Sequence, residues 1–120
     1  MGRIIIFLSL LMCCCITVDA QSAYYMQQAR SYQRDAEYYT KQAQVYDREV
    51  GYYKRQAQGY LCEAKYFSKR EKFDQVKSYQ RRAKDATERA ESYKRKADNA
   101  RERAELYTRK AEKSLQKAKK

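Results

Sequence analysis

Apolar residues recur through most of the chain with the spacing of an amphipathic helix. Between Tyr25 and Phe67, each alanine, with Val50 in the one gap, lies four positions after one aromatic residue and three before the next. Small residues therefore occupy position a of a heptad and aromatic residues occupy position d, which predicts a long helix with one apolar seam. The a positions are Ala29, Ala36, Ala43, Val50, Ala57 and Ala64. The d positions are Tyr25, Tyr32, Tyr39, Tyr46, Tyr53, Tyr60 and Phe67.

The heptads slip by two residues after Phe67 and then resume. Position a becomes Val76, Ala83, Ala90, Ala97, Ala104, Ala111 and Ala118. Position d becomes Tyr79, Ala86, Tyr93, Ala100, Tyr107 and Ser114, so tyrosine recurs there every fourteen residues. In one straight helix this slip would turn the seam by roughly 200°. We predict a first helix over 21–67, a bend or turn over 68–75 and a second helix over 76–120.

The turn segment contains no glycine or proline. Ser68 and Glu71 match the S-x-x-E pattern of a capping box, in which a serine and a glutamate satisfy the first free amides of a helix. This match predicts that a new helix starts within the 68–75 segment.

Antiparallel pairing places a small residue against a large one in every layer of the seam, which fills it without voids. A chain folded at 71/72 pairs residues whose numbers sum to 143, such as Tyr53 with Ala90 and Val50 with Tyr93. The predicted fold is therefore all-α: an antiparallel helical hairpin, or coiled coil, built from fourteen-residue Tyr/Ala repeats. The same contacts between two straight chains give an antiparallel dimer of long helices, and the sequence leaves both open.

Charged residues beside the seam agree with this pairing. The acidic g positions Asp35, Glu49 and Glu63 fall opposite the basic g positions Lys110, Lys96 and Arg82. We expect interhelical ion pairs there, which specify orientation more than they stabilise.

The first twenty residues have the pattern of a signal peptide. One arginine precedes the apolar run "IIIFLSLLMCCCITV", and Val18 and Ala20 are small residues placed for cleavage after Ala20. An uncleaved anchor is the alternative, although the run is shorter than the ~20 residues that a spanning helix needs. The pattern predicts a secreted, extracellular protein.

Cleavage would remove Cys13, Cys14 and Cys15 and leave Cys62 alone. An odd cysteine in an oxidising compartment is a candidate for an intermolecular disulfide, or else an unpaired or capped surface thiol. Cys62 occupies position f, opposite the seam, where we expect its side chain to face solvent.

A second set of tyrosines lies one step off the seam, at position c: Tyr24, Tyr38, Tyr52 and Tyr66. These rings either widen the apolar stripe or form an exposed tyrosine ladder. The ladder would be available for stacking, partner packing or oxidative cross-linking.

Basic residues concentrate in the second half of the chain. Residues 68–120 contain nineteen Lys/Arg and nine Asp/Glu, whereas residues 21–67 contain seven and five. The sequence predicts a polyanion-binding strip on the second helix at Arg82, Arg89, Lys96, Arg103 and Lys110. The alternative is a solvated charged face.

No constellation for catalysis, metal binding or cofactor binding is recognisable. The chain has no histidine, no zinc-ligand spacing, no calcium loop and no glycine-rich phosphate loop. We therefore expect a secreted, non-enzymatic coiled-coil protein, without metal or cofactor, that self-associates and binds an anionic polysaccharide or surface, with no specific nucleic acid. Its tyrosines are candidates for cross-linking. The alternatives are a membrane-active or antimicrobial cationic helix, which an Ala/Tyr face suits less, and a chain that becomes helical only on binding.

Overall fold

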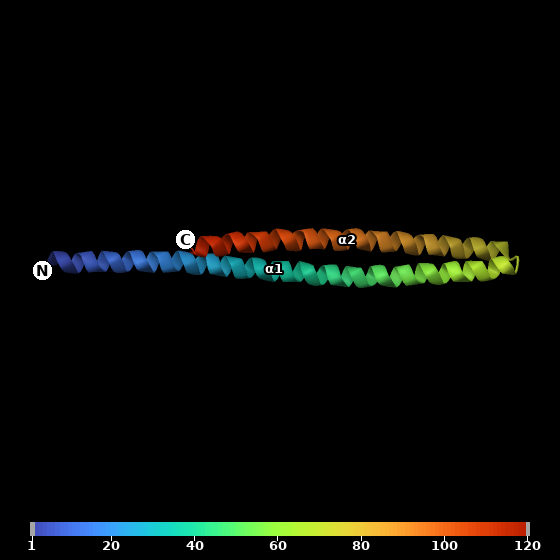
Figure 1. Cartoon of the computed structure of the whole chain (residues 1–120), viewed down its shortest axis with the longest axis horizontal. Coiled ribbons are helices and arrows are strands. Elements are labelled where there is room, and N and C mark those ends of the chain that lie inside the picture. The colour runs from blue at the N-terminus through green and yellow to red at the C-terminus, as the bar shows by residue number, and fades with distance from the viewer. Residues whose placement is uncertain (1, 120) are drawn as a thin grey trace. The chain divides into compact units, whose positions relative to one another are not determined.

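The computed structural model describes the backbone of residues 2–119 and the side chains of residues 20–119. It contains two helices, α1 (Gly2–Lys69) and α2 (Phe73–Lys119), joined by a short turn (Figure 1). The predicted signal peptide and its three cysteines fall on residues whose side chains, up to Asp19, lie outside the described part. The chain divides into two compact units, Met1–Tyr38 with Ala104–Lys120 (unit 1) and Tyr39–Arg103 (unit 2).

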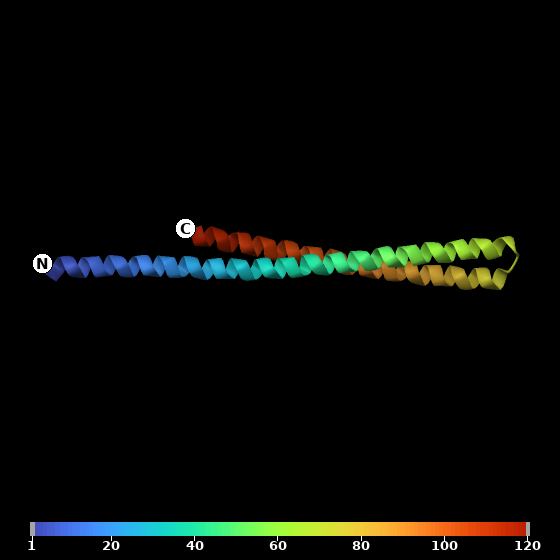
Figure 2. The same ribbon diagram turned by 90° about the horizontal axis from the view of Figure 1, so that it is seen from below.

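Unit 2 is an antiparallel pair of helices around the turn, and both ribbon views show α1 and α2 side by side there (Figures 1 and 2). The Tyr93 ring of α2 lies between two rings of α1, 6.1 Å from Tyr46 and 5.6 Å from Tyr53 between centroids. These two rings flank Val50, the predicted partner of Tyr93. The prediction of an all-α antiparallel helical hairpin is confirmed, and the contacts are made within one chain.

Tyr79 occupies the same kind of place one repeat nearer the turn. Its ring centroid is 6.2 Å from that of Tyr60 and 5.5 Å from that of Phe67, and the Phe67 ring is nearly parallel to it at 12°. In unit 2, Tyr79 and Tyr93 each therefore insert between two successive d rings of α1.

Unit 1 pairs the helices in the same orientation. The rings of Tyr32 and Tyr107 are 6.1 Å apart, and the Ser22 hydroxyl donates a hydrogen bond of 3.2 Å to the carbonyl of Ala118. Ser114 is buried, and its hydroxyl donates to the Gln28 side-chain oxygen at 3.1 Å. The hydroxyl of Ser114, a polar residue at seam position d, thus has its hydrogen-bond partner on the other helix.

The buried apolar side chains of the described part are all alanines. They are Ala29, Ala43, Ala57, Ala64, Ala83, Ala86, Ala90, Ala97, Ala100 and Ala111. The seam tyrosines are only half-buried, because two helices enclose a ring from the inner side alone. The hairpin consequently keeps part of its aromatic surface accessible to solvent.

The turn is tighter than the predicted 68–75 segment. Helix α1 ends at Lys69, and α2 begins at Phe73. The amide of Lys72 donates to the carbonyl of Phe67 and that of Glu71 to the carbonyl of Ser68, at 3.1 and 3.2 Å. These two bonds form a Schellman motif, which ends a helix with one residue in the left-handed conformation. Glu71 is that residue, with φ of 60°.

The predicted capping box is wrong. Ser68 still belongs to α1, and its carbonyl, not its hydroxyl, accepts the hydrogen bond from Glu71. The first amide bond of α2 runs from Val76 to the carbonyl of Lys72, so Lys72 is the residue at the N-cap. Ser68 and Glu71 match the S-x-x-E pattern, but they lie on either side of the end of α1 and not at the start of α2.

Candidate functional site: a row of cations on tyrosine rings

All six g positions of α2 from Arg82 onward are basic, and all six side chains are exposed. They are Arg82, Arg89, Lys96 and Arg103 in unit 2, and Lys110 and Lys117 in unit 1. We call these six residues the cation row. Five of them form the predicted polyanion strip, and Lys117 extends it.

Every member of the cation row lies over the face of a seam tyrosine. In unit 2 the cation-to-centroid distances are 5.1 Å for Arg82 on Tyr79, 5.7 Å for Arg89 on Tyr53, 4.8 Å for Lys96 on Tyr93 and 5.6 Å for Arg103 on Tyr39. In unit 1 they are 5.8 and 5.1 Å for Lys110 on Tyr32 and Tyr107, and 5.7 Å for Lys117 on Tyr25. Each such contact contributes about 0.5–1 kcal/mol at an exposed site.

The fourteen-residue repeat decides which helix supplies the ring. Where α2 has a tyrosine three residues before the cation, as in Tyr79 before Arg82, the cation lies on that ring of its own helix. Where α2 has an alanine there, as in Ala86 before Arg89, the cation lies on Tyr53 of α1 instead. The cations thus contact rings of both helices and connect α1 to α2.

The predicted g-to-g ion pairs are wrong. Among the described residues, Asp35, Glu49 and Glu63 form no ion pair within 4.0 Å, because the basic side chains opposite them lie on tyrosine rings. The long aliphatic stems of lysine and arginine pack on a half-buried ring while the charge stays in water. An exposed ion pair offers no comparable burial.

An ion pair is formed on the other side of the seam. Arg101 of α2 contacts Asp47 of α1, and its second guanidinium nitrogen lies 3.3 Å from Asp98. Both Asp47 and Arg101 are at position e. Within the described residues, this is the one ion pair that joins the two helices.

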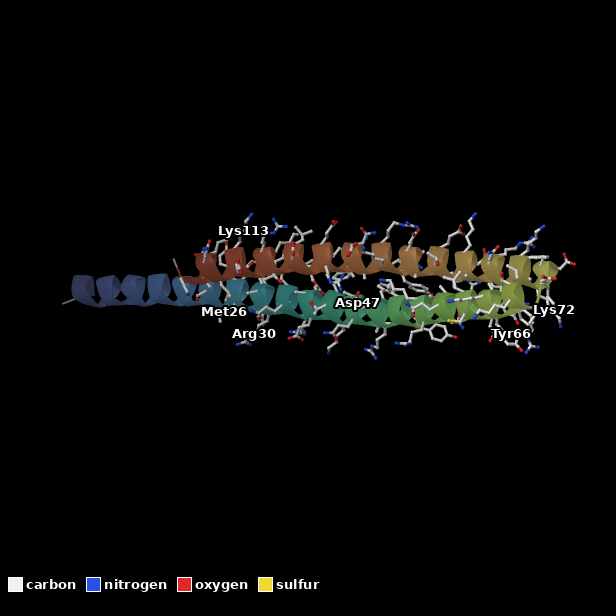
Figure 3. The ribbon with its side chains drawn as sticks, turned by 45° about the vertical axis from the view of Figure 1, so that its right-hand side comes forward. Met26, Arg30, Asp47, Tyr66, Lys72 and Lys113 are labelled. Carbon is white, nitrogen blue, oxygen red and sulfur yellow. The ribbon has the colours of Figure 1, made fainter. Side chains whose placement is uncertain are left out.

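The position-c tyrosines pack beside the seam rings and remain exposed. The exposed fractions of Tyr24, Tyr38, Tyr52 and Tyr66 are 60, 57, 47 and 46%. Edge-to-face contacts join Tyr24 to Tyr25, Tyr52 to Tyr53 and Tyr66 to Phe67 at 5.1–5.4 Å. Figure 3 shows Tyr66 on the side of α1 that is turned away from α2. Each aromatic pair therefore has one ring in the seam and one in contact with solvent.

Two further contacts hold position-c rings in place. The Gln56 amide donates a hydrogen bond of 2.8 Å to the Tyr52 hydroxyl, and the Arg70 guanidinium lies 4.4 Å from the Tyr66 centroid.

Cys62 is exposed and forms no disulfide.

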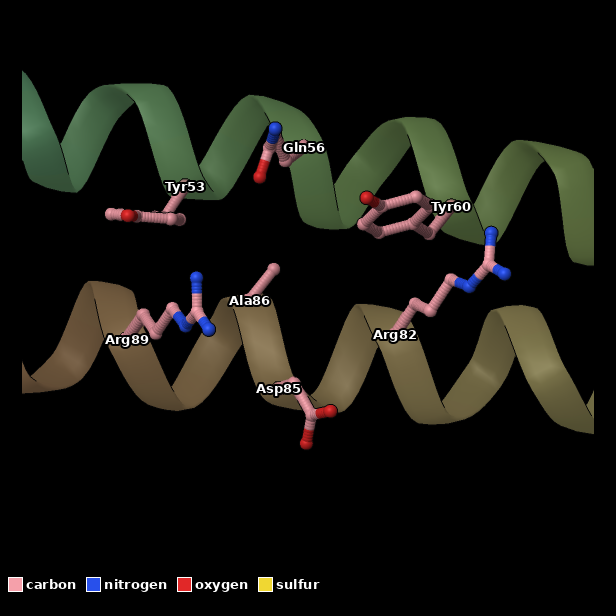
Figure 4. A pocket seen from close by; sticks show the side chains of 7 residues that line it. All are labelled: Tyr53, Gln56, Tyr60, Arg82, Asp85, Ala86 and Arg89. Carbon is pink, nitrogen blue, oxygen red and sulfur yellow. The ribbon is translucent and has the colours of Figure 1, made fainter.

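A small notch opens between Tyr53 and Tyr60, where α2 presents Ala86 and not a tyrosine (Figure 4). Its volume is about 170 Å³, and Gln56, Arg82, Asp85 and Arg89 complete its lining. Figure 4 shows the Ala86 methyl group directed toward α1 and the Asp85 side chain directed away from it. The notch thus combines two phenol rings with two guanidinium groups.

The described side chains contain no group of three or more Cys, His, Asp or Glu placed to hold a metal ion. Within the same part, neither helix has a stretch long and apolar enough to span a bilayer.

Analysis of the sequence found the basic residues but missed what lies beneath them. Tyrosine three residues before a basic residue recurs at Tyr79, Tyr93 and Tyr107, and this spacing was the available signal. The notch had a signal too, namely the alternation of tyrosine with alanine at position d of α2.

Comparisons of the chain with models of protein families, with curated proteins and with solved structures find no match.

Proposed function

We propose that this chain is a non-enzymatic, tyrosine-rich coiled-coil protein that binds anionic polymers or surfaces through its cation row. The observation that carries the proposal is that all six g positions of α2 from Arg82 onward are basic, exposed and in contact with a tyrosine ring. A merely solvated face would not require a cation at the same heptad position in six successive heptads.

The ring contacts favour binding by reducing its entropic cost. Ordering a long side chain on association costs about 0.5–1.5 kcal/mol. Here the rings already restrict the cations, which recur about every 10 Å along each helical segment at 1.5 Å per residue. A flexible polyanion gains from such an array by releasing its own counterions, so its affinity should fall as salt rises.

The chemistry favours an anionic polysaccharide or surface over specific nucleic-acid recognition. The cation row itself contains only lysine and arginine, with no amide or carboxylate among its six members to read a base edge. The signal-peptide pattern of residues 1–20 supports a secreted location, where sulfated polysaccharides are available. Self-association, with cross-linking of the exposed position-c tyrosines by an external oxidant, forms part of the same proposal.

A matched pair of triple variants tests the cation row. Replacing Arg89, Lys96 and Arg103 with glutamine should weaken retention on heparin resin. It should also reduce the slope of log K against log salt by about 2–3, because three counterion-releasing contacts are lost. The control removes the same charge from position f by replacing Arg34, Lys41 and Arg48, and it should have a smaller effect.

Equal effects of the two triples would show that net charge alone drives binding and would refute the cation row as the site. Absence of wild-type binding at ~0.15 M salt, where screening is short-ranged, would refute polyanion binding altogether. Leakage of anionic vesicles at micromolar protein would favour the membrane-active alternative.

A further inference from the structure

The aromatic seam of unit 2 alternates between filled and open layers. Tyr93 fills the space between Tyr46 and Tyr53, and Tyr79 fills the space between Tyr60 and Phe67. The intervening space, between Tyr53 and Tyr60, receives only the methyl group of Ala86. Alanine therefore stands at a d position of α2 where the two neighbouring layers have a tyrosine, and Ala100 repeats this pattern two layers further along.

The size of this notch matches one six-membered ring. Its volume is about 170 Å³, and an apolar cavity of about 150 Å³ in another protein holds one benzene molecule. Tyr53 and Tyr60 border the notch as successive d residues, in the same relation as the rings on either side of Tyr93. A ligand ring entering here would find the aromatic contacts that Tyr93 finds one layer away.

The polar lining of the notch favours a negative charge on that ligand. Arg82 and Arg89 both line it, and their guanidinium groups lie on the rings of Tyr79 and Tyr53. Position g of α1 is acidic beside the filled layers, at Glu49 and Glu63, but is the neutral Gln56 beside the notch. Asp85 is the acidic residue of the lining, and its side chain points away from α1 (Figure 4).

We propose that the Tyr53–Tyr60 notch binds a planar aromatic ring that carries an anionic group, of the aryl sulfonate, sulfate or carboxylate class. The ring stacks in the open layer, and a bidentate guanidinium contact from Arg82 or Arg89 holds the anion. This site is distinct from the binding of a polymer along the cation row, since it requires the empty layer as well as the charge.

Ala86→Tyr tests the site by supplying the missing ring from α2. We expect the new side chain to fill the notch as Tyr93 fills its own layer, and benzenesulfonate affinity, measured by NMR titration of the Tyr53 and Tyr60 ring protons, to fall at least tenfold. Thr87→Tyr is the matched control, because it adds the same side chain at an exposed neighbouring position outside the lining and should leave binding unchanged.

Two probes separate the contributions of ring and charge. Methanesulfonate keeps the anion without the ring, and benzyl alcohol keeps the ring without the anion, so both should bind at least tenfold more weakly than benzenesulfonate. Equal binding of methanesulfonate would overturn the stacking, and equal binding of benzyl alcohol would overturn the role of the guanidinium groups.

Wild-type protein provides a test that does not depend on any variant folding. Nuclear Overhauser contacts from the benzenesulfonate ring should reach Tyr53 and Tyr60, and contacts only to the exposed Tyr24 and Tyr38 would overturn the proposal. Ala86→Tyr retains every charge, so its retention on heparin resin should equal that of wild type. Loss of heparin retention in this variant would show that one surface serves both ligands and would overturn a separate notch site.

Discussion

Helices α1 and α2 share one heptad pattern but differ in the chemistry beside it. From Tyr25 to Phe67, helix α1 carries an aromatic residue at every d position, whereas α2 carries one at every second d position and a cation at every g position from Arg82 onward. Without α1, the cations Arg89, Arg103 and Lys117 of α2 would lack the rings that they contact. The difference shows that the hairpin is specified by pairing an aromatic helix with a cationic one, around a core that consists of alanine.

Removal of a tyrosine ring of α2 should lower the free energy of unfolding more than any other change considered below. Tyr93→Ala removes a ring that stacks on Tyr53, contacts Tyr46 and lies beneath Lys96. Full burial of an aromatic residue is worth about 3–5 kcal/mol, so the half-buried Tyr93 should contribute about 2 kcal/mol to the free energy of unfolding. We expect a decrease in melting temperature of about 10 °C by circular dichroism.

Tyr52→Ala is the control for this comparison. Its ring contacts Tyr53 from the exposed side of α1 and has 47% of its surface in water. We expect a loss of less than about 1 kcal/mol, since little area is uncovered. If Tyr52→Ala destabilised as much as Tyr93→Ala, insertion between the α1 rings would not be what stabilises the pair.

A substitution in the turn between the helices should raise the free energy of unfolding and not lower it. Glu71 has φ of 60°, a conformation that costs a non-glycine residue roughly 1 kcal/mol. Glu71→Gly should therefore raise the free energy of unfolding by about 1 kcal/mol, measured by denaturant titration.

The sign of this change also distinguishes a hairpin from a dimer of straight helices. In a straight helix, residue 71 would be helical, and glycine there would destabilise by about 1 kcal/mol. A lower stability for Glu71→Gly, together with a midpoint that depends on protein concentration, would contradict the intramolecular hairpin. Glu88→Gly, at an exposed position inside α2, should destabilise in either case and serves as the control.

The seam could be predicted from the sequence because its register follows from a simple steric rule. The predicted register, in which residue numbers sum to 143, places Tyr93 opposite Val50, and the contacts of Tyr93 with Tyr46 and Tyr53 have that register. The expectation of a small residue against a large one in every layer is wrong where Ala86 falls opposite Ala57, and the notch opens there. The turn was harder to predict from the sequence. Glu71 adopts a left-handed conformation, and the residue there is neither glycine nor asparagine, which are typical of that conformation.

The contacts of the cations were harder to predict because each has two competing partners. Lys96, for example, could reach Glu49 across the seam or Tyr93 on its own helix, and charge complementarity alone favours the glutamate. The outcome depends on how far the ring remains exposed, which in turn depends on the distance between the helices. The small alanine side chains of the core set the distance between the helices, so the residues at position g do not determine it.

The smallest expected effect isolates one ring contact of the cation row. Arg89 lies 5.7 Å from the Tyr53 centroid, whereas Arg95, at position f of the same helix, is exposed and has no ring contact. Arg89→Gln and Arg95→Gln each relieve the same repulsion in a chain of net charge +12. The difference between their free energies of unfolding therefore reports the ring contact alone, and we expect Arg89→Gln to be less stable by about 0.5–1 kcal/mol. A double-mutant cycle with Tyr53→Leu checks the assignment, because the cost of Arg89→Gln should disappear once the ring is gone. An Arg89→Gln cost that persists without the ring would mean that the cation is stabilised elsewhere, and that tyrosine does not order the cation row.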